Sequence, residues 1–183
     1  MESYLTSIIK QFEYYKSLGD KTLEQLTFED TQWQSHENAN SIAVIVKHLS
    51  GNMLSRWTNF LTEDGEKAWR NRDEEFIDSF TSFKALVAAW ESGWSCLFKA
   101  ISSLNETNLN EIIYIRNGGH TVIEAINRQL AHYSYHIGQI VFLGKLLKGY
   151  EWKSLSIPKG DSKTYNASKF SQEKENRHFT DDL

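Results

Sequence analysis

Histidines are the residues whose type and spacing in this 183-residue sequence most directly indicate chemistry. Two of the six, His132 and His136, are four positions apart in a segment with helical apolar spacing. Side chains four apart lie one turn from each other on the same helix face, so both imidazoles can hold one metal ion. The alternative is a pair of helix-edge histidines that hydrogen-bond to their neighbours. The spacing alone leaves both interpretations open.

A third histidine, His48, flanks the apolar stripe of another predicted helix. Helical bundles build metal sites from side chains on facing helices. His48, His132 and His136 together therefore predict a site for a divalent metal ion. Three protein ligands leave coordination positions open to water or substrate, which is typical of catalytic sites. A metal in such a site raises the acidity of bound water or of a bound thiol.

Two common metal motifs do not fit this sequence. The segment from His132 to His136 reads HYSYH and lacks the glutamate that zinc proteases carry after the first histidine. No Asp or Glu stands at helical spacing beside the pair, so a carboxylate-bridged di-iron centre is not expected. The other histidines fall in predicted loops or in the tail and are expected to be solvated: His36, His120 and His178.

The elements that must position these histidines are four predicted helices. Apolar residues recur at spacings of three and four over residues 2–26, 40–62, 79–104 and 121–147. The last helix begins with a capping box formed by Thr121 and Glu124. Pro158 is the only proline, so nothing before it interrupts a helix. The pattern predicts an all-α four-helix bundle, whose long connections leave the topology open.

The segments between and after the helices carry other signals. The β-favouring run at 112–115 and the Asn117-Gly118-Gly119 turn predict a short hairpin or extended loop before the fourth helix. Residues 27–40 are expected to form a loop, and the charged, non-periodic residues 63–78 an exposed connection. Residues 159–183 hold five basic and five acidic side chains. We expect a metal-binding bundle domain over 1–158 and an extended or partly disordered tail over 159–183.

Composition excludes several classes of function. The net charge of −4 argues against a protein that binds nucleic acid through its phosphates. No signal peptide is visible at the N-terminus, and no apolar run is long enough to span a membrane. With a single cysteine, Cys96, an intramolecular disulfide is excluded. The expectation is a cytoplasmic protein without membrane or nucleic-acid partners.

Together these motifs resemble the DinB-like (DinB/YfiT) metalloprotein superfamily. The resemblance rests on the histidine within IAVIVKHLSGNMLSRW (42–57) and the HxxxH within NRQLAHYSYHIGQIVFLGK (127–145). The segments GEKAWRNRDEEF (65–76) and LSIPKGDSKTYN (155–166) resemble one subgroup, long catalogued as a domain of unknown function. The resemblance implies a four-helix bundle of up-down-down-up topology, often dimeric. It also implies a divalent metal held by three histidines, which correspond to His48, His132 and His136.

The resemblance also implies an activity. Characterised members of the superfamily are mostly thiol-dependent transferases that use bacillithiol, mycothiol or glutathione, and a few are isomerases. We therefore expect a homodimeric, metal-dependent enzyme resembling thiol S-transferases, acting on a small molecule with a low-molecular-weight thiol. The alternatives are a non-catalytic, dimeric, stress-associated metal-binding protein and a metal-dependent hydrolase. Imidazole ligands suit zinc, nickel, copper and iron, of which zinc or nickel is expected.

Beyond the ligands, the sequence assigns no catalytic residue. Arg56 and Arg128 stand at helical spacing from the histidines and could bind the carboxylates of a thiol cofactor; the alternative is ordinary surface arginines. Cys96 has no histidine near it in the sequence and is expected to be a small buried apolar residue rather than a nucleophile. Tyr133 is expected in the core and Tyr135 on the surface.

Overall fold

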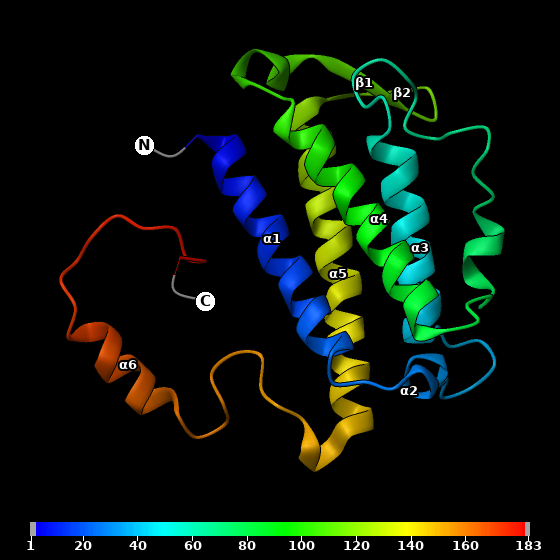
Figure 1. Ribbon diagram of the computed structural model, residues 1–183. Coiled ribbons are helices and arrows are strands. Elements are labelled where there is room, and N and C mark those ends of the chain that lie inside the picture. Colours follow the sequence, from blue (N-terminus) through cyan, green and yellow to red (C-terminus); the bar gives the residue numbers. More distant parts are fainter. Residues whose placement is uncertain (1–2, 182–183) are drawn as a thin grey trace.

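The computed structural model describes residues 3–181, which are mostly helical with one small two-stranded sheet. Four long helices lie side by side (Figure 1). Three of them lie inside the predicted ranges, with ends up to five residues short, and the fourth extends one residue past its predicted end, so the prediction of four long helices is confirmed. Their bounds are α1 Tyr4–Leu23, α3 Ile42–Trp57, α4 Phe83–Ser102 and α5 Val122–Lys148.

Each long helix begins at a side-chain oxygen that accepts a hydrogen bond from a backbone N–H three residues on. Such a cap satisfies one of the unpaired N–H groups of the first turn and is worth about 1 kcal/mol. At α5 the predicted capping box of Thr121 and Glu124 is present in both directions. The capping residues are Ser3, Ser41, Ser82 and Thr121.

The four helices form two parallel pairs. Near their N-terminal ends, α1 and α5 are joined by a hydrogen bond from the Tyr4 hydroxyl to the side-chain oxygen Oδ1 of Asn127. In the second pair, Ser50 of α3 donates to the backbone carbonyl of Ala89 of α4. The two pairs run in opposite directions (Figure 1). Because α3 and α4 are parallel, the connection over residues 58–82 must return along the bundle before α4 begins.

Aromatic side chains fill the space between the helices. Trp94 is buried and meets Phe12 of α1 edge to face, with ring centroids 6.5 Å apart. The predicted core position of Tyr133 is confirmed, because its ring is fully buried. Its hydroxyl accepts a hydrogen bond from Trp57 Nε1 and donates one to Asn52 Oδ1. This network pairs three of the polar groups that α3 and α5 bury between them.

The predicted hairpin precedes α5. Strands β1 (Ile112–Ile115) and β2 (Gly118–Thr121) pair antiparallel. The turn lies at Arg116 and Asn117, one residue earlier than the sequence indicates, and both have positive φ. The carboxylate of Asp64 accepts the backbone N–H groups of both turn residues at 2.8 Å. The hairpin is thereby attached to the connection that follows α3.

Shorter helices occupy segments that the sequence predicts as irregular. They bury too few apolar residues to show a helical period, which is why the pattern missed them. One of them, α6, lies within the segment predicted as an extended or partly disordered tail. Among residues 3–181, no helix combines the length and apolar character needed to cross a bilayer. The short helices are α2 Phe28–Gln32, α6 Ser162–Phe170, and the 3₁₀ turns η1 Asp73–Phe76, η2 Glu106–Asn110 and η3 Gly149–Glu151.

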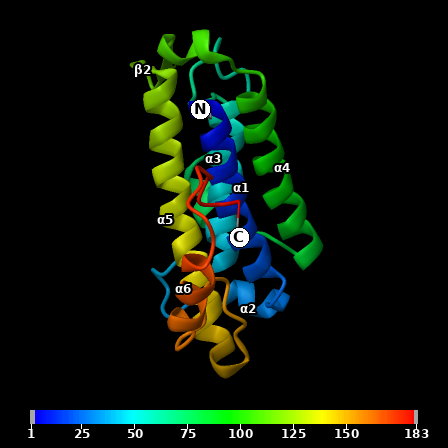
Figure 2. The ribbon, with the colours of Figure 1, turned by 90° about the vertical axis from the view of Figure 1, so that its left-hand side faces the viewer.

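The last described residues, 178–181, return to α1 (Figure 2). His178 Nε2 lies 3.0 Å from the hydroxyl of Ser7, and the ring of Phe179 meets Tyr14 edge to face. His178 is therefore half-buried, and the expectation that it is solvated is wrong. The tail reaches α1 through side chains that carry no periodic pattern. The division of the chain at residue 158 stays a prediction.

Gly144 shows how closely α1 and α5 approach. A Cβ atom at this position would lie 2.6 Å from Thr22 Cγ2, and Thr22 is fixed by a hydrogen bond to the carbonyl of Leu18. We predict that Gly144→Ala lowers the free energy of unfolding by about 1–3 kcal/mol, measured by chemical denaturation. The matched control is Gly138→Ala in the same helix, where a Cβ meets nothing within 4 Å and helix propensity favours Ala by up to about 1 kcal/mol. Equal effects of the two substitutions would contradict the close packing.

Candidate metal centre

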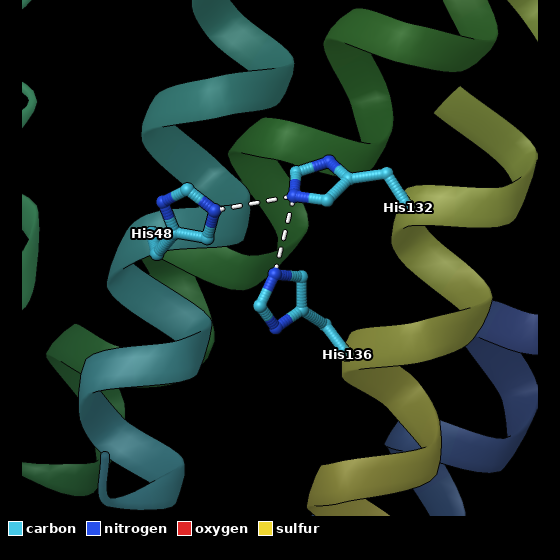
Figure 3. A group of neighbouring side chains, drawn as sticks. All are labelled: His48, His132 and His136. Atoms are coloured by element: carbon cyan, nitrogen blue, oxygen red, sulfur yellow. Dashed lines mark hydrogen bonds between the residues drawn. The ribbon is translucent and has the colours of Figure 1, made fainter. Parts of the chain in front are cut away.

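Three histidines converge between α3 and α5 (Figure 3). His48 comes from α3 and is buried, whereas His132 and His136 come from successive turns of α5 and are half-buried. His132 Nε2 lies 3.3 Å from His48 Nε2 and 3.1 Å from His136 Nε2. One ring nitrogen of each residue lies within 4.8 Å of the others. The structure thus brings together the three residues that the sequence predicts as ligands.

The spacing of these nitrogens fits one shared cation. Metal–imidazole bonds of about 2.0–2.1 Å at tetrahedral angles place two ligand nitrogens about 3.3–3.4 Å apart. The distances of 3.3 and 3.1 Å from His132 are close to that value. Two neutral imidazoles can share one proton, but three nitrogens facing one point exceed what hydrogen bonding among them can satisfy. The group therefore has the geometry of a three-histidine metal site.

Burial keeps two of the three imidazoles neutral. It lowers the pKa of His132 to about 3, and the neighbouring His136 and His48 act in the same direction. Burial likewise lowers the pKa of His136 to about 4. A neutral imidazole is the form that binds a metal. At neutral pH the ring nitrogens of both residues are therefore available without loss of a proton.

A carboxylate orients His48. Glu75 Oε2 lies 2.9 Å from His48 Nδ1, and since a carboxylate only accepts, Nδ1 carries the proton and donates it. The Nε2 lone pair consequently faces the other two histidines. Gln139 Oε1 lies 3.1 Å from His136 Nδ1 and can accept from it in the same way. Hydrogen bonds of this kind fix the tautomer and ring orientation of metal-binding histidines.

Glu75 is itself fixed by an arginine. Arg70 donates from Nε to Oε1 at 2.7 Å and from Nη2 to Oε2 at 2.8 Å. Burial opposes ionisation of Glu75, but the hydrogen bonds from Arg70 and His48 outweigh it and lower the pKa of its carboxyl group. The absence of a side chain at Gly51 leaves the room that Glu75 occupies against α3. Glu75 is thus a permanent anion next to the centre.

Sequence reasoning missed Glu75 and Arg70. Their segment, residues 63–78, was expected to be an exposed connection, and this expectation is wrong for Gly65, Lys67 and Glu75, which are buried. Charged residues are buried here because they pair with one another, a property that apolar periodicity does not register. The signal that could have found them is the segment GEKAWRNRDEEF, which contains both residues and carries part of the family resemblance.

A cleft of about 320 Å³ opens onto the three histidines. The group is therefore open on one side, and no fourth His, Cys, Asp or Glu of residues 3–181 joins it. The cleft walls come from α3, α5, the connection over 58–82 and the hairpin turn. Besides the histidines, the lining residues are Asn52, Arg56, Arg70, Arg72, Phe76, Arg116, Arg128 and Gln129.

The remaining candidates divide between this cleft and other places. Arg56 and Arg128 both line it. Cys96 instead contacts Thr58, with 3.6 Å between Sγ and Oγ1, and lines a separate cavity of about 410 Å³ between residues 57–62 and the C-terminal half of α4. His120 stands 3.4 Å from Arg128 and is not part of the histidine group. Tyr135 is 65% exposed, as expected.

The fold and the site define a class of protein: a helical protein in which two facing helices supply three histidines to one open candidate metal centre. Residues 1–161 match the family described as "Protein of unknown function (DUF1572)". The chain belongs to this family, which is DinB-like, and the superfamily expected from the sequence is confirmed. Comparison with curated proteins and with solved structures gives no significant match to either.

The centre predicts a loss of metal in three variants. His48→Ala, His132→Ala and His136→Ala each remove one of three ligands, so we expect the metal content to fall from about one ion per chain to near zero. Elemental analysis of purified, metal-loaded protein measures it. His120→Ala is the control, because His120 lies outside the group. Full metal content in all three ligand variants would show that the site is wrongly assigned.

Glu75 predicts a second effect. Glu75→Gln removes the charge that orients His48 and leaves Arg70 with Glu66 as its remaining carboxylate partner. We expect metal affinity to fall about 10- to 100-fold, measured by competition with a chromophoric chelator. Glu74→Gln is the matched control, since Glu74 is the exposed neighbour in the same turn. A variant at position 75 that binds metal as tightly as the position 74 control would contradict the positioning role.

Proposed function

We propose that this protein is a DinB-like, divalent-metal-dependent enzyme that transfers a low-molecular-weight thiol to a small electrophilic molecule. The observation that carries the proposal is the cleft that opens onto the three histidines, because an open side leaves room for substrate. The two antiparallel pairs of parallel helices support the up-down-down-up topology of that superfamily. The proposal includes the homodimer that the resemblance implies.

A bound zinc or nickel ion would supply Lewis acidity, which lowers the pKa of a thiol so that its thiolate is available near neutral pH. The protein supplies the positions of the groups. Glu75 keeps the proton of His48 on Nδ1, and Arg70 keeps Glu75 in place. Phe76 stacks on the His48 ring, with centroids 5.0 Å apart and planes 28° from parallel. This apolar wall shields one face of the imidazole from water.

The same contacts make hydrolysis the weaker candidate. Metal-assisted hydrolysis uses a base that takes a proton from the attacking water. No Asp or Glu is among the residues of the described chain that line the cleft. Glu75 is nearest, but its oxygens accept from Arg70 and His48. A thiol that ionises before attack needs no such base, which favours transfer.

A non-catalytic metal-binding protein is expected to have a closed metal site, whereas the site of the described chain is open. A structural metal site is closed by a fourth protein ligand and has no cavity beside it. In the part of the chain described, the group has three members and the cleft adjoins all of them. We therefore favour an enzyme over a metal-binding protein that acts through dimerisation alone.

The proposed function predicts catalysis of thiol transfer to an electrophile. Metal-loaded protein, incubated with glutathione, cysteine, bacillithiol or mycothiol and the electrophile 1-chloro-2,4-dinitrobenzene, is expected to form the thioether, with release of chloride and of the thiol proton, faster than metal-free protein. Absorbance of the dinitrophenyl product measures the rate. His132→Ala is expected to reduce the rate to that of the metal-free protein, whereas His120→Ala keeps it. No acceleration with any of these thiols would overturn the proposal.

A further inference from the structure

The cleft beside the histidines has an unusual charge. Five arginines line it, whereas the chain as a whole carries a net charge of −4. Within residues 3–181, two carboxylates form salt bridges with these arginines. Glu66 contacts Arg56, Arg70 and Arg116, and Glu75 contacts Arg70. A third carboxylate, Asp64, lies close enough to Arg56 for the guanidinium to lower its pKa. Three carboxylates for five guanidinium groups leave an excess of two positive charges around the cleft.

Two of the arginines, Arg72 and Arg128, form no salt bridge with a carboxylate of residues 3–181. Arg128 precedes His132 by one turn on α5, and its Nη1 lies 3.4 Å from His120 Nε2. Arg72 lies over the ring of Phe76, 5.0 Å from its centroid, and Phe76 in turn stacks on His48. The two unneutralised guanidinium groups therefore approach the histidine group from α5 on one side and from the connection on the other.

Two buried polar atoms of the same cleft lack a hydrogen-bond partner within the part of the chain that the structure describes. They are Arg56 Nε, a donor on a residue that is 6% exposed, and Gln129 Oε1, an acceptor on a residue that is 4% exposed. A buried polar group without a partner costs about 1–3 kcal/mol, so each such group requires an explanation, such as a functional role or a bound water or ion. A donor on a guanidinium suits an oxyanion, and the amide oxygen suits a hydroxyl or amine of the same ligand.

Positive charge at this place opposes metal binding unless something offsets it. Guanidinium groups beside a divalent cation repel it, and the repulsion is strong where water is partly excluded. An anion in the cleft would relieve the repulsion, and it would bind by paired hydrogen bonds to arginine. Binding of the two is reciprocal: an anion that raises the affinity for the metal has its own affinity raised by the bound metal by the same factor.

We propose that the cleft is a binding site for a small oxyanionic molecule, with a carboxylate or phosphate group held by Arg72 and Arg128 and a hydrogen-bond donor directed at Gln129. The proposed ligand defines the class of substrate that the site accepts. The inference rests on the proposed function in one respect, namely that the bound anion is a substrate. A volume of about 320 Å³ limits the ligand to a small metabolite. Carboxylate and phosphate share the recognition chemistry and are separate arms of the test.

The test is calorimetric titration of the metal-loaded full chain at low salt with L-malate, inorganic phosphate or, as the uncharged control, glycerol. We expect saturable binding of about one malate or one phosphate per chain and none of glycerol. Arg72→Gln and Arg128→Gln are each expected to weaken anion binding about tenfold or more, because each removes a charge-assisted hydrogen bond. Both residues are exposed, so their replacement leaves the core intact, and an unchanged melting temperature verifies this.

The matched control is Lys84→Gln, which removes one positive charge from the exposed surface of α4, outside the cleft. It is expected to leave anion affinity unchanged. No saturable binding of either anion, or equal losses in all three variants, would overturn the inference. Malate binding without phosphate binding assigns the site to carboxylates, and the reverse assigns it to phosphates.

The outcome is separable from that of the thiol-transfer assay. Anion binding that depends on Arg72 and Arg128, together with no thiol transfer, would support this inference and overturn the proposed function. Transfer that proceeds at the same rate in both arginine variants, without detectable anion binding, would support the proposed function and overturn this inference.

Discussion

The carboxylate of Glu75 is the contact on which the arrangement of the site depends. It accepts from Arg70 and from His48 Nδ1 while buried against α3, so one group fixes a ring tautomer and also attaches the 58–82 connection to the bundle. Breaking a buried pair of this kind leaves an uncompensated charge, which is strongly destabilising. The pair therefore holds the connection against α3 at Arg70 and Glu75, next to the cleft residues Arg72 and Phe76.

The parts of this structure that could be predicted from the sequence are those governed by local geometry. Helical spacing located the four long helices, and it placed His132 and His136 on one face because the turn of a helix fixes that relation. His48 could be added because facing helices share a core. Glu75 and Arg70 could not, since their contacts are set by how an irregular segment folds back on α3. The position of the hairpin turn could not be predicted either. Asp64, which is distant in the sequence, accepts the N–H groups of Arg116 and Asn117, and turn propensities do not include such a contact.

The net charge of the chain describes the surface as a whole but does not describe the local charge of the cleft. The acidic balance of the chain argues against nucleic-acid binding, but it conceals five arginines gathered around three histidines. They come from α3, α5, the connection and the hairpin turn, so no stretch of sequence displays them as a basic motif. A site composed of residues from four segments becomes visible only once the fold has brought them together.

The parallel pairing of α3 and α4 has a further consequence for how this architecture diversifies. Parallel neighbours cannot be joined by a tight turn, so the chain needs a long return segment, and here that segment passes the open side of the histidine group. Three of the residues that line the cleft, Arg70, Arg72 and Phe76, thus lie outside the long helices that supply the core and the three ligands. Substitutions in the return segment can alter the ligand that is accepted while the interhelical packing stays unchanged. The parallel direction of α3 and α4 thus separates the residues that can change ligand specificity from those that maintain the helix packing.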